Sequence, residues 1–147
     1  SPCAGWCAVL EPAALTEAWE IPASAARRLV AMYGSEHVRV LGHAAREPEL
    51  LQSLAPGSAL LAVEAVHAAR EGMAMTLEDF LHRRCDVMLF GEDGSREAAG
   101  EAAMVMAREL GWSPEETRRQ VAAYEAASAR ATAFRSGDKA SAAEAAV

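Results

Sequence analysis

The chain has 147 residues and a net charge of −7 at pH 7, and its basic residues are dispersed apart from three short arginine pairs. Nucleic-acid binding needs clustered lysine and arginine, so this acidic balance argues against a nucleic-acid partner. About a quarter of the residues are alanine and Ile21 is the only isoleucine, so strong helix formers dominate and strand formers are scarce. The composition predicts a single domain with an all-α fold.

The first half of the chain predicts a loose arm followed by short helices. Residues 1–22 contain three prolines among small residues, which indicates a linker or N-terminal arm. Apolar residues at helical spacing predict a helix over 23–33, and Gly34 is expected to end it. Short helices are expected between Ser35 and Leu54, and Ser58–Met73 is the next long apolar-periodic run.

A second helix signal opens at Thr76, where Thr76 and Asp79 have the spacing of a capping box. The apolar residues of the following helix are expected to form its buried face, with one arginine on the same side: Leu77, Phe80, Leu81, Met88 and Arg84. An exposed turn is expected at 91–94, where two glycines flank two acidic residues.

Two longer helices are predicted for the C-terminal part. Ser95 is expected to cap a helix that ends at Gly111, and Ser113-Pro114-Glu115-Glu116 is a strong start signal for a helix reaching about Phe134. Residues 136–147 are small, polar and alanine-rich and predict a frayed or disordered tail. The sequence thus predicts a compact bundle of six or seven helices over residues 23–135, without a repeat at a fixed period.

The cysteines and the hydropathy pattern bear on the compartment. Cys3, Cys7 and Cys85 cannot all pair with one another, and no second cysteine pair completes a zinc site with Cys3 and Cys7. We therefore expect reduced thiols in a cytoplasmic protein. No apolar run is long enough for a membrane span, and the N-terminus lacks the pattern of a signal peptide.

No complete catalytic constellation is evident. The four histidines, His37, His43, His67 and His82, have no nucleophile signature beside them. Cys85 follows two arginines that would lower its pKa if they were close, although a buried structural cysteine is the simpler interpretation.

A carboxylate-bridged di-metal bundle is one alternative. Glu64-x-x-His67 and Asp79-x-x-His82 each place an acid and a histidine on one helical face, as di-iron bundles do twice. Glu101 or Glu109 would have to supply the two further carboxylates, and Asp79 already has a capping role.

Arg83 and Arg84 form the one basic pair in an organised setting. They are candidates for an interdomain contact or for binding an anion. The simpler alternative is ion pairing with Glu78, Asp79 or Glu109 at a helix end.

An ordered set of short motifs runs through most of the chain. The pieces are Tyr33-Gly34-Ser35, Val40-Leu41, Leu50 with Leu54, Glu64-Ala65-Val66, Glu71-Gly72-Met73-Ala74, Thr76 to Arg84, and Met106-Ala107-Arg108-Glu109-Leu110-Gly111-Trp112. Together they resemble the C-terminal helical domain of FAD-dependent, respiratory-type glycerol-3-phosphate dehydrogenases, over about Ala23 to Tyr124. The chain departs from the family pattern after the arginine pair: Cys85 stands where the family usually has threonine, and Asp86 where a basic residue is common. These two changes bear on the detailed geometry of the arginine block.

The resemblance implies a parent enzyme that oxidises sn-glycerol 3-phosphate to dihydroxyacetone phosphate and passes electrons through FAD to quinone. It places the flavin and substrate sites in preceding domains, so it assigns no catalytic, cofactor-binding or metal-binding residue to this chain. The implied partner is the flavin-binding domain of the parent chain, and the resemblance also allows a homo-oligomer and a peripheral contact of the parent with the inner face of the membrane. A stand-alone helical module that binds protein partners is the alternative function.

Overall fold

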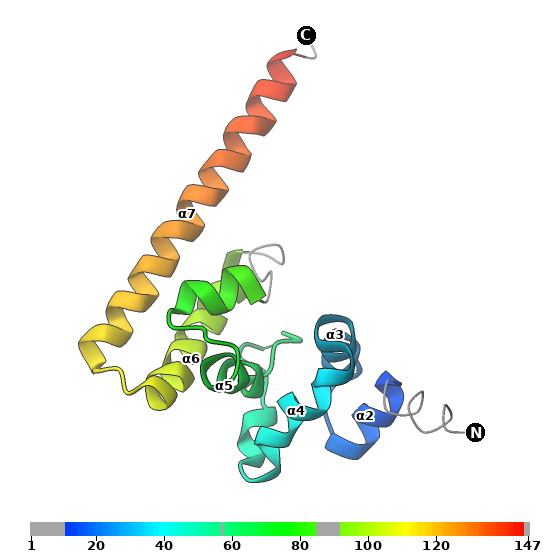
Figure 1. Cartoon of the computed structure of the whole chain (residues 1–147). Helices are drawn as coiled ribbons and strands as arrows, with labels where there is room; N and C mark the ends of the chain where they lie inside the picture. Colours follow the sequence, from blue (N-terminus) through cyan, green and yellow to red (C-terminus); the bar gives the residue numbers. More distant parts are fainter. Residues whose placement is uncertain (1–10, 57, 85–91, 146–147) are drawn as a thin grey trace.

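The computed structural model describes residues 11–56, 58–84 and 92–145 and is helical almost throughout. Six α-helices lie in these ranges, which confirms the predicted all-α fold and helix number. In Figure 1 the short helices α2 to α5 and the lower part of α6 cluster together, whereas α7 extends away from them.

The chain starts its described part with α2 (Pro12–Trp19) and α3 (Ala23–Tyr33), which pack against each other. Leu15 of α2 and Ile21 of the connection are buried in the core. The structure therefore places α2 in the helical body, where the sequence predicted a linker, because burying these two apolar side chains stabilises the segment. Gly34 ends α3 at a φ of +52°, as predicted, and its N–H donates to the Val30 carbonyl.

Short turns of helix connect α3 to the centre of the molecule. They are the 3-10 helix η1 (Gly34–Glu36), α4 (His37–Gly42), and the 3-10 helices η2 (His43–Ala45) and η3 (Pro48–Leu51). Val40 and Leu41 of α4 are buried, which turns this helix toward the core and leaves Val38 exposed.

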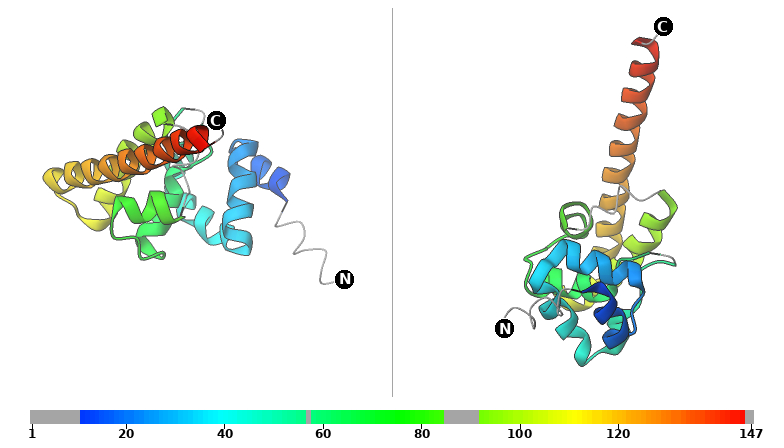
Figure 2. Two further views of the ribbon diagram at one scale, coloured as in Figure 1. Left: turned by 90° about the horizontal axis from the view of Figure 1, so that it is seen from above. Right: turned by 90° about the vertical axis from the view of Figure 1, so that its right-hand side faces the viewer.

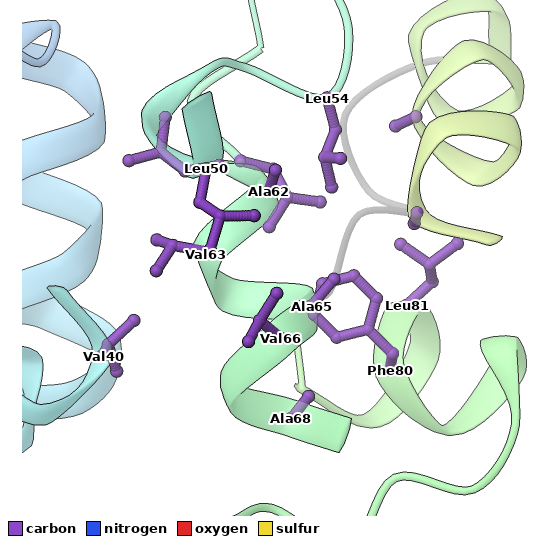
Figure 3. Close-up of a cluster of buried hydrophobic side chains, with 14 of the residues drawn as sticks. Val40, Leu50, Leu54, Ala62, Val63, Ala65, Val66, Ala68, Phe80 and Leu81 are labelled. Carbon is purple, nitrogen blue, oxygen red and sulfur yellow. The ribbon is translucent and has the colours of Figure 1, made fainter. Parts of the chain in front are cut away.

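Helix α5 (Ala62–Arg70) is the centre of the fold, and every residue from Ala62 to Ala68 is buried. A helix that is buried all round belongs to the interior of a domain. Figure 3 shows Val40 on one side of α5 and Phe80 with Leu81 on the other. On its remaining side α5 packs against α6 (Glu92–Leu110). Four alanines are among the buried residues of α6, and small side chains allow neighbouring helices to approach closely: Ala98, Ala99, Ala102 and Ala103.

The predicted helix over Ser58–Met73 starts four residues later than expected. The backbone around Leu61 is extended, because Leu54 N–H donates to the Leu60 carbonyl at 2.9 Å and Ala62 N–H donates to the Gln52 carbonyl at 3.0 Å. This short antiparallel pairing holds residues 60–61 out of the helix. The predicted turn at 91–94 is also wrong in its described part, since Glu92 already belongs to α6.

Helix α7 (Pro114–Ala145) has 32 residues and begins at the predicted cap, where Glu116 N–H donates to the Ser113 hydroxyl at 3.1 Å. Tyr124 is buried, but Phe134 is 72% exposed. Figure 1 and the right-hand view of Figure 2 show the C-terminal half of α7 extending beyond the other helices. The expected helix end near Phe134 is wrong, because adding alanine-rich residues to an existing helix is favourable without any packing. For the same reason residues 136–145 are helical where a disordered tail was predicted.

Candidate functional site

The Thr76 block begins as predicted but continues as an unusual helix. The Thr76 hydroxyl accepts a hydrogen bond from Asp79 N–H at 3.0 Å, and Leu77, Phe80 and Leu81 are buried. The segment Asp79–Arg84 (η4) is a π-helix instead of the expected α-helix. Short π-helical segments are rare and occur frequently at functional sites.

The Arg83–Arg84 pair lies at the end of this π-helix. The side chains of both arginines, together with Cys85, Asp86 and Met88, lie outside the described residues, so the proposed anion or interdomain contact stays a prediction. Glu109, one of the partners considered for the pair, already accepts hydrogen bonds from Arg70 at 2.7 and 3.1 Å.

The carboxylates of the di-metal hypothesis are engaged elsewhere in the described part of the chain. Glu64 pairs with Arg28, Glu109 pairs with Arg70, and Glu101 is exposed on α6. His82 packs edge-on against the Tyr124 ring, with centroids 5.3 Å apart. Among the described residues, the ligand-type atoms that come together are those of His43, His67 and Glu71, so the structure does not assemble the carboxylates and histidines of the di-metal alternative.

Glu64 is a buried acid with a structural role. Its carboxylate binds the Arg28 guanidinium of α3 and accepts a hydrogen bond from Leu61 N–H at 2.9 Å. Burial raises the pKa of Glu64 above its ordinary value, and the Arg28 charge and the Leu61 hydrogen bond act in the opposite direction. The ion pair thus offsets the cost of placing a carboxylate in the core.

A second polar cluster joins the start of η2 to the end of α5. His67 lies in the last turn of α5 and Glu71, four residues later, directly follows the helix on the same side, and His43 approaches them from η2. His43 Nε2 lies 3.4 Å from His67 Nδ1 and 3.5 Å from Glu71 Oε1, and His67 Nδ1 lies 3.9 Å from Glu71 Oε2. Among the described residues these three bring their ligand-type atoms within 4.8 Å of one another.

The environment of this cluster favours a neutral His67. The imidazole is buried, and burial lowers its pKa, while the Glu71 carboxylate acts in the opposite direction. The edge of the Tyr33 ring meets His67 at a centroid distance of 5.8 Å and an interplanar angle of 86°. A neutral, sterically fixed imidazole is the form that binds metal ions.

Charged groups surround the cluster on its solvent side. Arg39 forms an ion pair with Glu71 Oε2 at 3.0 Å, and Arg70 and Arg108 form ion pairs with Glu47 and Glu109. A cavity of about 460 Å³ borders the cluster at His43. It is lined by Gly42, His43, Arg46, Glu47 and Arg70.

The sequence contained only part of the signal for this cluster. The His67-x3-Glu71 spacing places two candidate ligands on one helical face, but the sequence-based prediction paired His67 with Glu64 instead. Glu64 pairs with Arg28 of α3, so the acid that lies beside the histidines is the one a turn further along the helix, Glu71. His43 lies 24 residues before His67, and only the turns between α4 and α5 bring the two together.

None of the helices in the described ranges has the length and apolar character that crossing a membrane requires.

Comparisons with known proteins agree on one relationship. Residues 5–117 match the family described as the C-terminal domain of alpha-glycerophosphate oxidase. The chain is 38% identical over 98 residues to glycerol-3-phosphate dehydrogenase 2 of Mycobacterium tuberculosis and of Mycobacterium bovis, which covers 67% of this chain and 17% of each relative. It is 38% identical over 100 residues to glycerol-3-phosphate dehydrogenase of Mycobacterium leprae, covering 68% of this chain and 17% of that protein.

The matched region thus spans about a sixth of the length of these relatives. No solved structure matches the chain. The family match covers more than three quarters of the chain and includes α2 to α6 and the start of α7. The chain therefore belongs to the family of C-terminal domains of alpha-glycerophosphate oxidase.

Proposed function

We propose that the chain is the accessory C-terminal domain of an FAD-dependent glycerol-3-phosphate dehydrogenase and that it packs on the flavin-binding body of that enzyme. The observation that carries the proposal is the family match over residues 5–117, in a region that accounts for 17% of the dehydrogenase relatives. The family is FAD-dependent in general. In this function the flavin body oxidises sn-glycerol 3-phosphate to dihydroxyacetone phosphate, and no residue of this chain has a catalytic or flavin-binding role.

The docking surface that we propose starts immediately before the Thr76 block. Met73 is 85% exposed and Met75 is 63% exposed, although large apolar side chains are usually covered. Met73 also has a φ of +55°, a left-handed conformation that is unfavourable for a residue with a side chain. Flexible methionine side chains adapt well to a partner surface. The flavin body would cover both methionines and contact Arg83 and Arg84 at the far end of the block.

The localisation that accompanies this function is cytoplasmic, with the parent enzyme in peripheral contact with the inner face of the membrane. Self-association into a homo-oligomer stays a prediction.

The gene provides the first test. Reading the frame upstream of the Ser1 codon should reveal a continuous coding sequence with a Gly-x-Gly-x-x-Gly motif between a predicted strand and a helix, the pattern of a dinucleotide-binding fold. An in-frame stop codon followed by a start codon next to Ser1 would overturn the proposal in favour of a stand-alone module.

The second test addresses the surface. The upstream flavin body and the 147-residue chain are co-expressed as separate polypeptides, and the copurified chain is quantified. Met73→Gln with Met75→Gln, and separately Arg83→Gln with Arg84→Gln, should each reduce copurification at least tenfold. Met32→Gln, at a methionine of α3 that is 46% exposed, is the matched control and should leave it unchanged. Equal recovery of all variants would refute the docking surface.

A further inference from the structure

The distances within the cluster of His43, His67 and Glu71 are unusual for hydrogen bonds. The three separations between their nitrogen and oxygen atoms are 3.4, 3.5 and 3.9 Å. Good hydrogen bonds between such atoms span about 2.7–3.2 Å. The three groups therefore gather one ligand-type atom each within 4.8 Å of one another without forming good hydrogen bonds among themselves.

These separations fit ligands around a common metal ion. Two ligand atoms that each lie about 2.0–2.1 Å from a tetrahedral zinc ion are about 3.3–3.4 Å apart. Two of the three observed separations, 3.4 and 3.5 Å, are close to that value. The third, 3.9 Å, joins His67 to the other Glu71 oxygen, Oε2, so the two carboxylate oxygens face different histidines, and the Glu71 side chain is 33% exposed.

We propose that His43 Nε2, His67 Nδ1 and the Glu71 carboxylate form a binding site for a divalent transition-metal ion such as Zn²⁺. Two histidines and one glutamate are an established ligand set for zinc, with a fourth position left for water or another ligand. His43 also lines the 460 Å³ cavity, so one ligand of the site borders an open space.

The surroundings support the ligands in the manner expected of a metal site. His67 is buried and packs in a T-shaped contact with Tyr33, which restricts its ring, and Arg39 forms an ion pair with one oxygen of Glu71 at 3.0 Å. Partners that orient the ligands from outside are a regular part of metal sites. Two of the ligands come from the end of α5 and one from η2, so the ion would also join these two segments.

The site does not depend on the proposed docking function, because all of its ligands lie within this chain.

Calorimetric titration of the chain with Zn²⁺, after removal of bound metals with EDTA, tests the proposal. We expect one equivalent of Zn²⁺ to bind and to raise the melting temperature, since an ion that binds the folded state stabilises it. His43→Gln, His67→Gln and Glu71→Gln should each weaken binding by at least tenfold and abolish the rise in melting temperature. Glu49→Gln, at an exposed carboxylate of η3, is the matched control and should bind like the wild type.

Substitution with Co²⁺ identifies the ligands independently. A site of two imidazoles and a carboxylate gives visible d–d absorption without a sulfur-to-metal charge-transfer band. His43→Gln and Glu71→Gln alter half-buried or exposed side chains, so they keep the test informative if His67→Gln does not fold. The proposal would be overturned if the wild type did not bind Zn²⁺, or if the folded His43 and Glu71 variants bound it unchanged. A thiolate charge-transfer band in the Co²⁺ spectrum would also overturn it.

Discussion

Replacing Arg28 with methionine should expose the energetic role of the buried Glu64 carboxylate. Arg28 of α3 supplies the charge that balances Glu64 in the core, and burial already raises the pKa of Glu64 above its ordinary value of 4.5. Methionine keeps most of the length and packing of the arginine stem but removes its charge. The carboxylate of the Arg28→Met variant is then left with the Leu61 N–H as its backbone donor.

Protonation limits the cost of this change. An unpaired buried carboxylate takes up a proton. Protonation lowers the free energy of unfolding by about 1.4 kcal/mol for each unit by which the pH exceeds the ordinary pKa of the group, which amounts to about 3.4 kcal/mol at pH 7. Because the wild-type carboxyl already has a raised pKa, we expect Arg28→Met to lower the free energy of unfolding by about 2–3 kcal/mol at pH 7.

The sign of the pH dependence follows from the raised pKa. A carboxyl whose pKa is higher in the folded state than in the unfolded state binds more protons when the protein is folded. Its contribution to stability is therefore complete below the pKa of the unfolded state and is lost as the pH rises through the pKa of the folded state. The variant has the larger increase in pKa and therefore loses more stability between pH 5.5 and pH 7. At pH 5.5 the penalty should fall to about 1 kcal/mol or less.

Urea unfolding followed by circular dichroism at pH 5.5 and pH 7 measures both values, and both lie above the sequence pI of 5.1. Arg27→Met is the control, because Arg27 is the exposed neighbour on the same helix and should change stability by less than about 0.5 kcal/mol. A penalty that is equal at the two pH values, or an equal effect of the Arg27 variant, would refute the account of a charge stranded in the core.

Three further changes test the backbone and the helix ends. Gly111 has a φ of +70°, so Gly111→Ala should destabilise the protein by about 1 kcal/mol. Gly100 lies within α6 with open space at its Cβ position, so Gly100→Ala should stabilise the protein by about 0.5–1 kcal/mol. Thermal unfolding should show shifts of opposite sign for the two variants. Ser113→Ala removes the cap of α7 and should lower the free energy of unfolding in urea by about 1 kcal/mol. Ser113→Asp keeps a capping oxygen and should retain the wild-type stability. Deleting residues 135–147 should change the free energy of unfolding by less than about 1 kcal/mol, because this part of α7 extends beyond the other helices, and a larger loss would show that it packs on the body.

Local chemistry made several helix boundaries predictable, although α6 begins at Glu92 and not after the expected cap at Ser95. The stop at Gly34 and the caps at Thr76 and Ser113 depend on the residues at those positions and a few neighbours, and the structure confirms each of them. The start of α5 was not predictable in this way, because residues around Leu61 are held extended by backbone bonds to Gln52 and Leu54. Such pairing between separate segments leaves no periodic signature.

The sequence identified the family more reliably than it identified a site. The ordered motifs from Tyr33 to Trp112 gave the relationship that the comparisons confirm. The histidine cluster escaped prediction because two acids, Glu64 and Glu71, lie within one turn of His67 on either side of it in sequence. Only the fold shows that Glu64 pairs with Arg28 of α3, whereas Glu71 lies beside His43 and His67.

Glu64 also determines how parts of the molecule can unfold. One of its oxygens binds the first turn of α5 at Leu61, and the other binds Arg28, which is 36 residues earlier in the chain. The first turn of a helix ordinarily opens on its own, because its N–H groups lack partners within the helix. In this protein, opening the first turn of α5 disturbs the carboxylate that holds α3, and releasing α3 leaves that carboxylate without its cation. The start of α5 and the docking of α3 therefore form one cooperative unit, so the amide protons at this helix start should exchange with solvent as slowly as those of the core.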